Sequence, residues 1–262
     1  EIIHLVKGRI FPDYDTREIG ISTQLAIKAM SKSTGISEKE IIKLWKKTGD
    51  IGEIAEEISK KKRQSSLFST ELTVKKVLEN LQKLPALGGK GTVDKKMGLI
   101  SELLVSANAL ETKYIVRTLL SDLRIGVGEG VLRDAIVWAC LDKENKEDFS
   151  IVQEAYDTTT DFAEVFEKAC KSRSALENLE LSPGKPLKVM LAQKAESIAD
   201  GFEAIGKPAA FEYKYDGFRM LINKEESGRI RVFTRRLEEV TKQFPEVEEY
   251  VKKHIKGNSF II

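Results

Sequence analysis

The stretch FEYKYDGFR, residues 211–219, carries the clearest structural signal in the sequence. Apolar and polar residues alternate in FEYKY, an Asp-Gly pair follows, and FRMLIN continues as a second apolar segment. Alternation of this kind favours β-strands, and Asp-Gly is a preferred two-residue hairpin turn. The stretch therefore predicts a β-hairpin that carries Lys214 at its tip, beside Asp216 and Arg219.

A lysine in this setting is a candidate nucleophile. A lysine amine attacks only when it is neutral, and ordinary lysine is protonated at neutral pH, so burial or a neighbouring cation is required. Arg219 could supply that cation and could also hold a phosphate. The alternative is a plain surface hairpin with solvated charges, which is a common use of such turns. The residues of the stretch alone leave both interpretations open.

The rest of the chain divides into a helical part and a mixed part. Eight segments carry apolar residues at three- and four-residue spacing and predict α-helices: TQLAIKAMSK, SEKEIIKLWKKTG, IGEIAEEISKK, LTVKKVLENLQKL, TVDKKMGLISELLVSA, ETKYIVRTLLSDL, EGVLRDAIVWACL and TDFAEVFEKACKS. Two prolines and a glycine in ELSPGKP, residues 180–186, then predict a linker. After it, FRMLIN and RIRVFTRR alternate as strands, and the Ser-Gly pair between them predicts a turn. We expect an all-α domain over residues 1–178 and a domain of strands and helices over residues 179–262.

Composition fits two packed domains but gives no simple sign of a nucleic-acid binder. With 262 residues and a hydrophobic content of 41%, the chain can bury ordinary cores. Lys and Arg total 43 against 41 for Asp and Glu, so any DNA-binding surface must come from local clustering of charge. No apolar run approaches the roughly 20 residues that span a bilayer, and no signal-peptide pattern opens the sequence, so we expect a soluble intracellular protein.

The cysteines and histidines predict no metal site. Cys140 and Cys170 lie in apolar, helix-like surroundings without metal-ligand spacing, so buried free thiols in a reducing compartment are the expectation. Only His4 and His254 are present, which argues against a histidine-built metal centre.

Two glycine-rich loops in the helical part could meet phosphate. The loop LRIGVGEGV, residues 123–131, separates two helical segments, so free backbone amides at the start of the second helix could face an anion. The loop LGGKGTVDKK, residues 87–96, is basic and lacks the glycine-lysine order of a P-loop. A tight helix–helix corner and an ordinary solvated loop are the respective alternatives. The basic run KKKRQ, residues 60–64, adds to a diffuse DNA-facing surface.

The run Lys214-Tyr215-Asp216-Gly217 followed by Arg219 resembles the K-x-D-G-x-R signature of the covalent nucleotidyltransferases, which include DNA ligases, RNA ligases and capping enzymes. Its neighbours resemble the ATP-dependent DNA ligases of the archaeal and eukaryotic type. These neighbours are Glu212, the FTRRLE segment at residues 233–238, and Met190-Leu191-Ala192, where Val189 replaces the usual proline.

The resemblance implies an all-α N-terminal DNA-binding domain followed by the first part of an α/β (α+β) nucleotidyltransferase adenylation domain. It implies that Lys214 takes AMP covalently from ATP, with Mg²⁺ or another divalent metal neutralising charge, and it leaves the metal ligands unknown. By the same resemblance Glu212 lies beside the adenine, and Arg219 and Arg235 contact the sugar and phosphate. Asp216 is expected to be a turn former.

For the helical domain, the resemblance to ligase DNA-binding domains favours phosphate contacts by Arg124 and by the amides of Gly126 and Gly128, and Lys90 is a further candidate. The implied partner is nicked duplex DNA in replication, repair and recombination, with a sliding clamp as a further candidate partner. A monomer without membrane attachment is expected, in the cytoplasm and nucleoid, or in the nucleus of a eukaryote.

Both ends of the sequence look cut, because it opens EIIH without an initiator methionine and stops in SFII, a strand-like segment. We therefore expect a fragment that lacks the later adenylation motifs and the OB-fold domain and does not seal nicks alone. Two alternative functions are an RNA ligase or capping-type nucleotidyltransferase and a non-catalytic helical DNA-binding scaffold. The long helical domain argues against the first, and the second predicts no covalent nucleotide.

Overall fold

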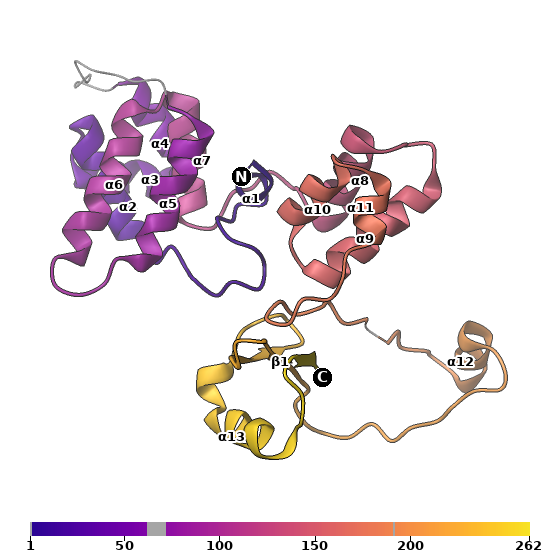
Figure 1. Cartoon of the computed structure of the whole chain (residues 1–262). Coiled ribbons are helices and arrows are strands. Elements are labelled where there is room, and N and C mark those ends of the chain that lie inside the picture. The colour runs from indigo at the N-terminus through magenta and orange to yellow at the C-terminus, as the bar shows by residue number, and fades with distance from the viewer. Residues whose placement is uncertain (1, 62–71, 191) are drawn as a thin grey trace. The chain divides into compact units, whose positions relative to one another are not determined.

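The chain is described by a computed structural model, which defines residues 2–61, 72–190 and 192–262. It divides into two compact units. The first comprises Glu1–Ala155 and Asp161–Leu179, and the second comprises Tyr156–Thr160 and Glu180–Ile262 (Figure 1). The domain limits 1–178 and 179–262 stay a prediction.

The first unit is built of helices, as the spacing of its apolar residues predicts. In chain order they are α1 (Ile2–Val6), α2 (Thr23–Thr34), α3 (Glu38–Thr48), α4 (Ile51–Lys60), α5 (Val74–Lys83), η1 (Leu84–Ala86), α6 (Thr92–Ser106), α7 (Ala109–Leu119), α8 (Glu129–Cys140), α9 (Lys146–Thr159), α10 (Phe162–Ala169) and α11 (Arg173–Glu177). The last residues of α9 belong to the second unit. All eight predicted helical segments are confirmed, and α1, α9 and α11 add to them.

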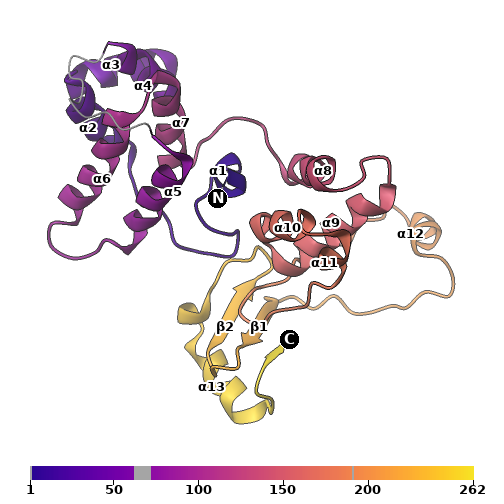
Figure 2. The same cartoon turned by 45° about the horizontal axis from the view of Figure 1, so that its top comes forward.

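Helices α2 to α7 pack around one hydrophobic core, and they form a bundle in Figure 2. The core residues lie three and four positions apart along each helix, which places them on one face. Fully buried side chains from these helices include Ile27, Met30, Ile41, Ile54, Ile58, Leu81, Ile100, Leu103 and Leu104. Among these helices, α4 with α7 and α2 with α6 form the most extensive contacts. This packing places the start of α4 beside the end of α7, and the candidate DNA-contact loop follows the end of α7.

The expectation of buried free thiols is wrong. Cys140, at the end of α8, and Cys170, directly after α10, form a disulfide with 4.9 Å between their Cα atoms. Cys140 is half-buried and Cys170 is exposed. Apolar residues precede both cysteines in the sequence, but each cysteine lies at the end of its helix, where the chain leaves the packed interior. The packing of α8 against α10 brings the two ends together.

The second unit contains a three-stranded antiparallel sheet. Strands β1 (Met220–Lys224), β2 (Ile230–Thr234) and β3 (Phe260–Ile261) lie in the order β2-β1-β3, and β1 pairs with β2 from Met220 opposite Thr234 to Lys224 opposite Ile230. Helix α13 (Pro245–His254) packs on the sheet. The shared core comprises Ile230, Val232, Val240 and Val251. A second helix of this unit, α12 (Ile198–Ile205), buries none of its residues.

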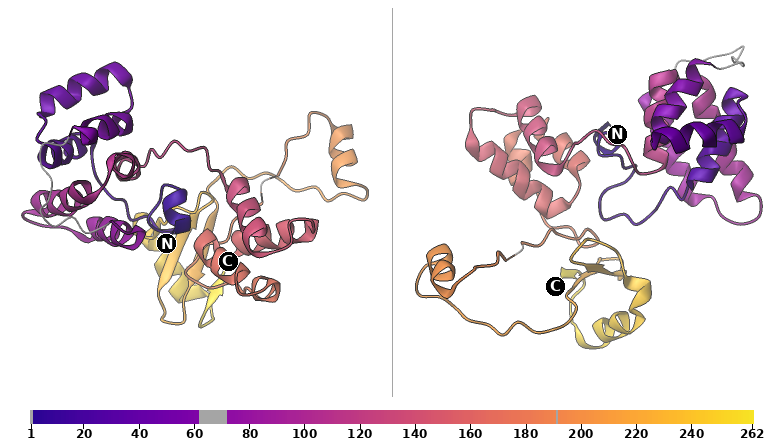
Figure 3. Two further views of the ribbon diagram at one scale, coloured as in Figure 1. Left: turned by 90° about the horizontal axis from the view of Figure 1, so that it is seen from above. Right: turned by 180° about the vertical axis from the view of Figure 1, so that it is seen from behind.

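The predicted hairpin at FEYKY and Asp-Gly is wrong. The hairpin lies one segment later, where β1 and β2 are joined through a turn in which Gly228 adopts a φ of 82° and donates to the Glu225 carbonyl. Residues 209–219 form no strand in this structure, and Phe211, Tyr213 and Tyr215 are 81%, 88% and 86% exposed. A strand requires a ladder partner and a face to bury, and within the described residues this alternating segment has neither. Figure 3 shows it as part of an open connection that carries α12.

The predicted linker is a loop that is packed rather than free. The Gly184 N–H donates to Asn223 Oδ1 at 3.1 Å, and Arg231 donates to the Gly184 carbonyl. The Thr160 hydroxyl donates to the Pro186 carbonyl at 2.9 Å. The first two bonds attach the loop to strands β1 and β2, and the third attaches it to the end of α9. Within the described residues, no helix is long and apolar enough to cross a membrane.

Candidate functional site

Lys214 lies in the exposed loop that precedes β1. The loop is held on both sides by aromatic contacts: Phe211 meets Phe202 edge to face with 6.0 Å between ring centroids, and Phe218 stacks on Phe244 at 5.6 Å. Between them Lys214 is exposed, and it forms no hydrogen bond or ion pair within the part of the chain that the structure describes. The side chain of the lysine is therefore open to solvent and accessible to a substrate.

The two candidate nucleotide arginines lie at one end of the sheet. Arg219 directly precedes β1 and Arg235 directly follows β2, and the strands pair there with Met220 opposite Thr234. Continued by one residue, the antiparallel register places Arg219 and Arg235 opposite each other at this end of the two strands. A tight turn follows β2, in which the Leu237 N–H donates to the Thr234 carbonyl at 2.9 Å. Two arginines at one strand end can hold a polyphosphate.

Glu212 and Asp216 lie in the same exposed loop as Lys214, and the structure does not bring them to the arginine pair. The described residues contain no group of three or more histidine, cysteine or carboxylate side chains placed to hold a metal ion. Leu191 of the Met190-Leu191-Ala192 motif lies outside the described residues, and Met190 beside it is 96% exposed. The residues present fit the phosphates of a nucleotide by charge, and they supply no assembled cation site.

The second candidate site is the loop between α7 and α8. Arg124 and Ser121 both have a φ of 54°, and Gly126 has a φ of 69°. Gly126 and Gly128 are exposed, and neither of their N–H groups is bonded within the described residues. Gly128 is the N-cap of α8. Exposed amides at a helix start attract anions because the helix dipole is positive there.

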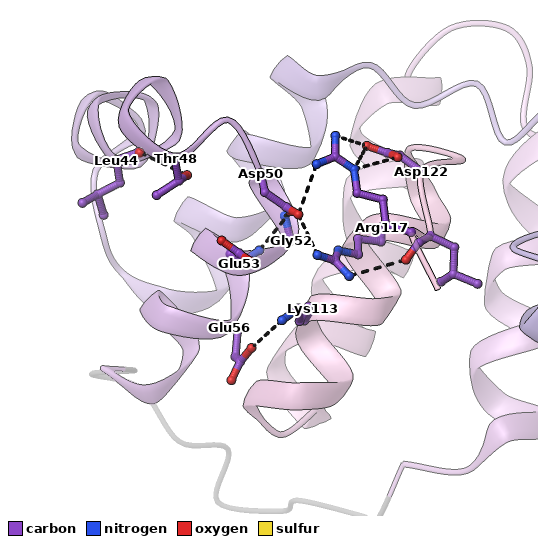
Figure 4. A network of polar contacts seen from close by, with 11 residues as sticks. Leu44, Thr48, Asp50, Gly52, Glu53, Glu56, Lys113, Arg117 and Asp122 are labelled. Carbon is purple, nitrogen blue, oxygen red and sulfur yellow. Dashed lines mark hydrogen bonds and ion pairs between the residues drawn. The ribbon is translucent and has the colours of Figure 1, made fainter. Parts of the chain in front are cut away.

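A buried charge network holds this loop, and sequence reasoning missed it. Arg117, in the last turn of α7, donates through Nη2 to Asp50 Oδ2 at 2.6 Å, and its side chain is 10% exposed (Figure 4). Its Nη1 donates to the Leu123 carbonyl at 3.5 Å. Arg124 adds a contact from Nη1 to the same oxygen of Asp50 at 3.3 Å. The network thus fixes the start of the loop to α7 and α4.

Asp50 is also the N-cap of α4. Its Oδ1 accepts from the N–H groups of Gly52 at 2.8 Å and Glu53 at 3.2 Å. Burial alone would raise the pKa of Asp50, but the hydrogen bonds from Arg117, Glu53 and Gly52 outweigh it and lower the pKa below its ordinary 3.8. The carboxylate is therefore fully charged at neutral pH. A sequence signal existed: Asp50 follows the helix-ending Gly49, and Arg117 lies among the apolar residues Ile115, Val116 and Leu119.

The outer edge of the Arg124 side chain is taken by Asp122. Arg124 Nε lies 2.9 Å and 2.8 Å from the two carboxylate oxygens, and Nη2 lies 2.8 Å from Oδ2. Both side chains are 50% exposed. This hydrogen bonding raises the pKa of Arg124 further above its ordinary value. The predicted DNA contact is thus exposed but paired with an anion.

The other basic residues predicted to face DNA are Lys90, which is exposed, and Lys60 and Lys61, which form ion pairs. Lys90 is exposed between Gly89 and Gly91, which have φ values of 81° and 79°. Lys60 and Lys61 form ion pairs one helical turn back, with Glu56 and Glu57, at 2.8 Å and 2.7 Å. Their charge is therefore partly neutralised. The rest of the predicted basic run, residues 62–64, lies outside the described residues.

Comparison with known proteins identifies the family. Residues 1–137 match the family model described as DNA ligase N terminus, and residues 189–262 match the ATP dependent DNA ligase domain. The chain is 43% identical over 263 aligned positions to a DNA ligase of Methanosphaera stadtmanae, covering 100% of this chain and 46% of the relative. It is 40% identical to a DNA ligase of Thermococcus onnurineus, covering 99% and 45%, and 39% identical to one of Nanoarchaeum equitans, covering 100% and 45%.

The chain thus spans about half the length of the curated relatives it matches. The match to the N-terminal model covers the helical bundle and the Arg124 loop, and the match to the second model covers Lys214, Arg219 and Arg235. Each candidate site therefore lies within a region that a DNA ligase family model matches. The chain belongs to the ATP-dependent DNA ligase family.

Proposed function

We propose that the protein containing this chain seals nicks in duplex DNA at the expense of ATP, with Lys214 as the nucleophile. The observation that carries the proposal is the run Lys214-Tyr215-Asp216-Gly217-Phe218-Arg219 inside the region matched by the ATP dependent DNA ligase domain. The match of the helical unit to the N terminus of DNA ligases supports DNA as the polymer, rather than a capped RNA end.

In the first step Lys214 Nζ attacks the α-phosphorus of ATP. The nitrogen attacks as the neutral amine, after its ammonium form has lost one proton to solvent. A P–N bond forms, the bond from the α-phosphorus to the bridging oxygen breaks, pyrophosphate leaves, and the nitrogen gives up a second proton to solvent. The proposed roles of Arg219 and Arg235 are to hold the phosphates and sugar, which their place at one end of the β1–β2 ladder supports. Glu212 is proposed to accept a hydrogen bond from the adenine.

The next two steps transfer the nucleotide to DNA and release it. AMP passes from Lys214 to the 5′-phosphate of the nick, and the 3′-hydroxyl then attacks that phosphate and displaces AMP. The proposal includes Mg²⁺ or another divalent ion to neutralise the phosphates in each step. The chain's own contribution is to present the amine on an accessible loop between the contacts of Phe211 and Phe218.

The helical unit is proposed to bind the sugar-phosphate backbone. Arg124, the amides of Gly126 and Gly128, and Lys90 are proposed to contact phosphates, because all of them are exposed and none of the amides is bonded within the described residues. Such contacts read no sequence, which suits an enzyme that must act at any nick. The proposed enzyme is a monomer that acts on the cell's own DNA. A sliding clamp is proposed as a further partner.

The test is nick sealing by the complete gene product on a labelled nicked duplex. Lys214→Ala should abolish sealing while DNA affinity stays unchanged. Lys90→Ala, at another exposed lysine, is the matched control and should weaken DNA binding without removing the chemistry. Sealing with NAD in place of ATP, or full sealing by Lys214→Ala, would refute the proposal.

A further inference from the structure

In the structure without DNA, the guanidinium of Arg124 is paired with the carboxylate of Asp122. The Nε and Nη2 edge of its guanidinium faces both oxygens of Asp122 at 2.8–2.9 Å. A phosphate can take this edge in a two-point contact, because carboxylate and phosphate both match the planar fork of arginine. A DNA phosphate that takes this edge must therefore displace Asp122.

The two carboxylates around Arg124 differ in how firmly they are held. Asp50 is 12% exposed, and its two oxygens are bonded to the start of α4 and to Arg117. Asp122 is 50% exposed, and its side chain contacts only Arg124 within the described residues. Displacing Asp50 would leave Arg117 buried without its anion, which is costly. Displacing Asp122 returns a carboxylate to water at little cost.

The backbone supports a functional origin for this pair. Asp122 lies between Ser121 and Arg124, which both adopt the left-handed region at a φ of 54°. Non-glycine residues occupy that region at an energetic cost, and such residues cluster at functional sites. The Arg117 bond to the Leu123 carbonyl and the Asp50 contact hold the turn in this shape. The turn keeps Asp122 and Arg124, two residues apart, facing each other.

We propose that Asp122 is an intramolecular competitor of DNA, which occupies Arg124 in the free protein and yields it to a backbone phosphate on binding. Asp50 is the positioning residue that stays in place during the exchange. The inference rests on the proposed role of Arg124 in binding DNA. The exchange lowers the affinity for duplex DNA, because separating Asp122 from Arg124 costs part of the binding free energy.

The size and the salt dependence of the effect follow from the geometry. Exposed ion pairs are weak, so removing the competitor should tighten DNA binding by about two- to fivefold. In the exchange the freed Asp122 takes up a cation, which offsets part of the counterion release at the phosphate. Without Asp122 that offset is lost, so the affinity should fall more steeply with salt. The slope of log K against log salt concentration should steepen by up to about one unit, which corresponds to one more released ion.

The experiment compares DNA affinity of the complete gene product and its Asp122→Asn variant by fluorescence anisotropy with a labelled nicked duplex across a salt series. Glu53→Gln is the matched control, because Glu53 is exposed and its charge acts on Arg124 without a contact. Arg124→Gln and the Arg124→Gln/Asp122→Asn double variant close a mutant cycle. Thermal unfolding of each variant confirms that it folds.

The proposal predicts tighter binding and a steeper salt slope for Asp122→Asn, a smaller change for Glu53→Gln, and no gain from Asp122→Asn in the Arg124→Gln background. An equal gain for Glu53→Gln, or a gain that persists without Arg124, would show a general charge effect and overturn the proposal. Weaker binding by Asp122→Asn would also overturn the proposal, because it would show that Asp122 supports DNA binding. If Arg124→Gln alone leaves affinity unchanged, the proposed DNA role of Arg124 itself is wrong.

Discussion

Replacing Asp50 with alanine should destabilise the helical unit by about 4 kcal/mol. Loss of a helix N-cap costs about 1 kcal/mol, and removing one partner of a buried ion pair costs about 3 kcal/mol at the lower end of measured cases. Both losses fall on one residue, because Oδ1 caps α4 while Oδ2 holds Arg117. Asp50→Asn keeps the Oδ1 acceptor for the cap but turns an amide N–H donor toward Arg117, so it should retain the capping contribution and still cost about 3 kcal/mol.

Native-state hydrogen exchange of the complete gene product measures this loss where it occurs. Amides of α4 and of the last turn of α7 should lose protection in Asp50→Ala by about the predicted free energy. Asp122→Ala removes an exposed carboxylate from the same network and should cost less than about 1 kcal/mol. Replacing Arg117 by methionine together with Asp50→Ala should recover part of the loss, because no buried charge is then left unpaired. Equal losses for Asp50→Ala and Asp122→Ala would refute the reasoning.

Three further predictions concern the same unit. Gly52→Ala places a Cβ 2.6 Å from the Cγ and Nε of Arg117, so it should displace that side chain and cost about 1–3 kcal/mol by denaturant unfolding, whereas an unchanged midpoint would contradict the packing. Because the pKa of Asp50 is lowered in the folded state, its stabilisation is complete above the ordinary 3.8 and is lost as pH falls through the lowered value; Asp50→Asn should therefore flatten the acid limb of the stability profile. Reduction of the Cys140–Cys170 disulfide, whose cysteines are 30 residues apart, should lower stability by about 3–4 kcal/mol, and a Tm that ignores reductant would rule that contribution out.

The sequence predicts most of the helical unit because helix formation depends on local spacing. In α3 the apolar stripe lies within the helix, and the N-cap Ser37 and the left-handed Gly49 directly flank it, so the local pattern alone locates the helix. The β1–β2 pair is predicted for a similar reason, since its Ser-Gly turn is local. The FEYKY strand is predicted wrongly because alternation shows only a tendency. A strand also needs a partner, and local sequence does not supply one.

The candidate sites show the same division. Lys214, Arg219 and Arg235 follow from a motif that is contiguous or nearly so, and their roles stay predictions. The Asp50–Arg117 pair joins residues 67 positions apart, so only the packing of α4 on α7 reveals it. The disulfide is hidden for a related reason, because apolar neighbours predict burial but do not show that two helix ends meet.

The most direct test of the central claim is the intact mass of the complete gene product after incubation with magnesium and ATP, GTP or NAD. We predict a single added AMP from ATP alone, mapped to Lys214 by peptide sequencing and absent in Lys214→Ala. An added GMP would indicate capping chemistry, and AMP from NAD would indicate the other class of ligase. No adduct, or an adduct that survives Lys214→Ala, would contradict the assignment of Lys214 as the nucleophile.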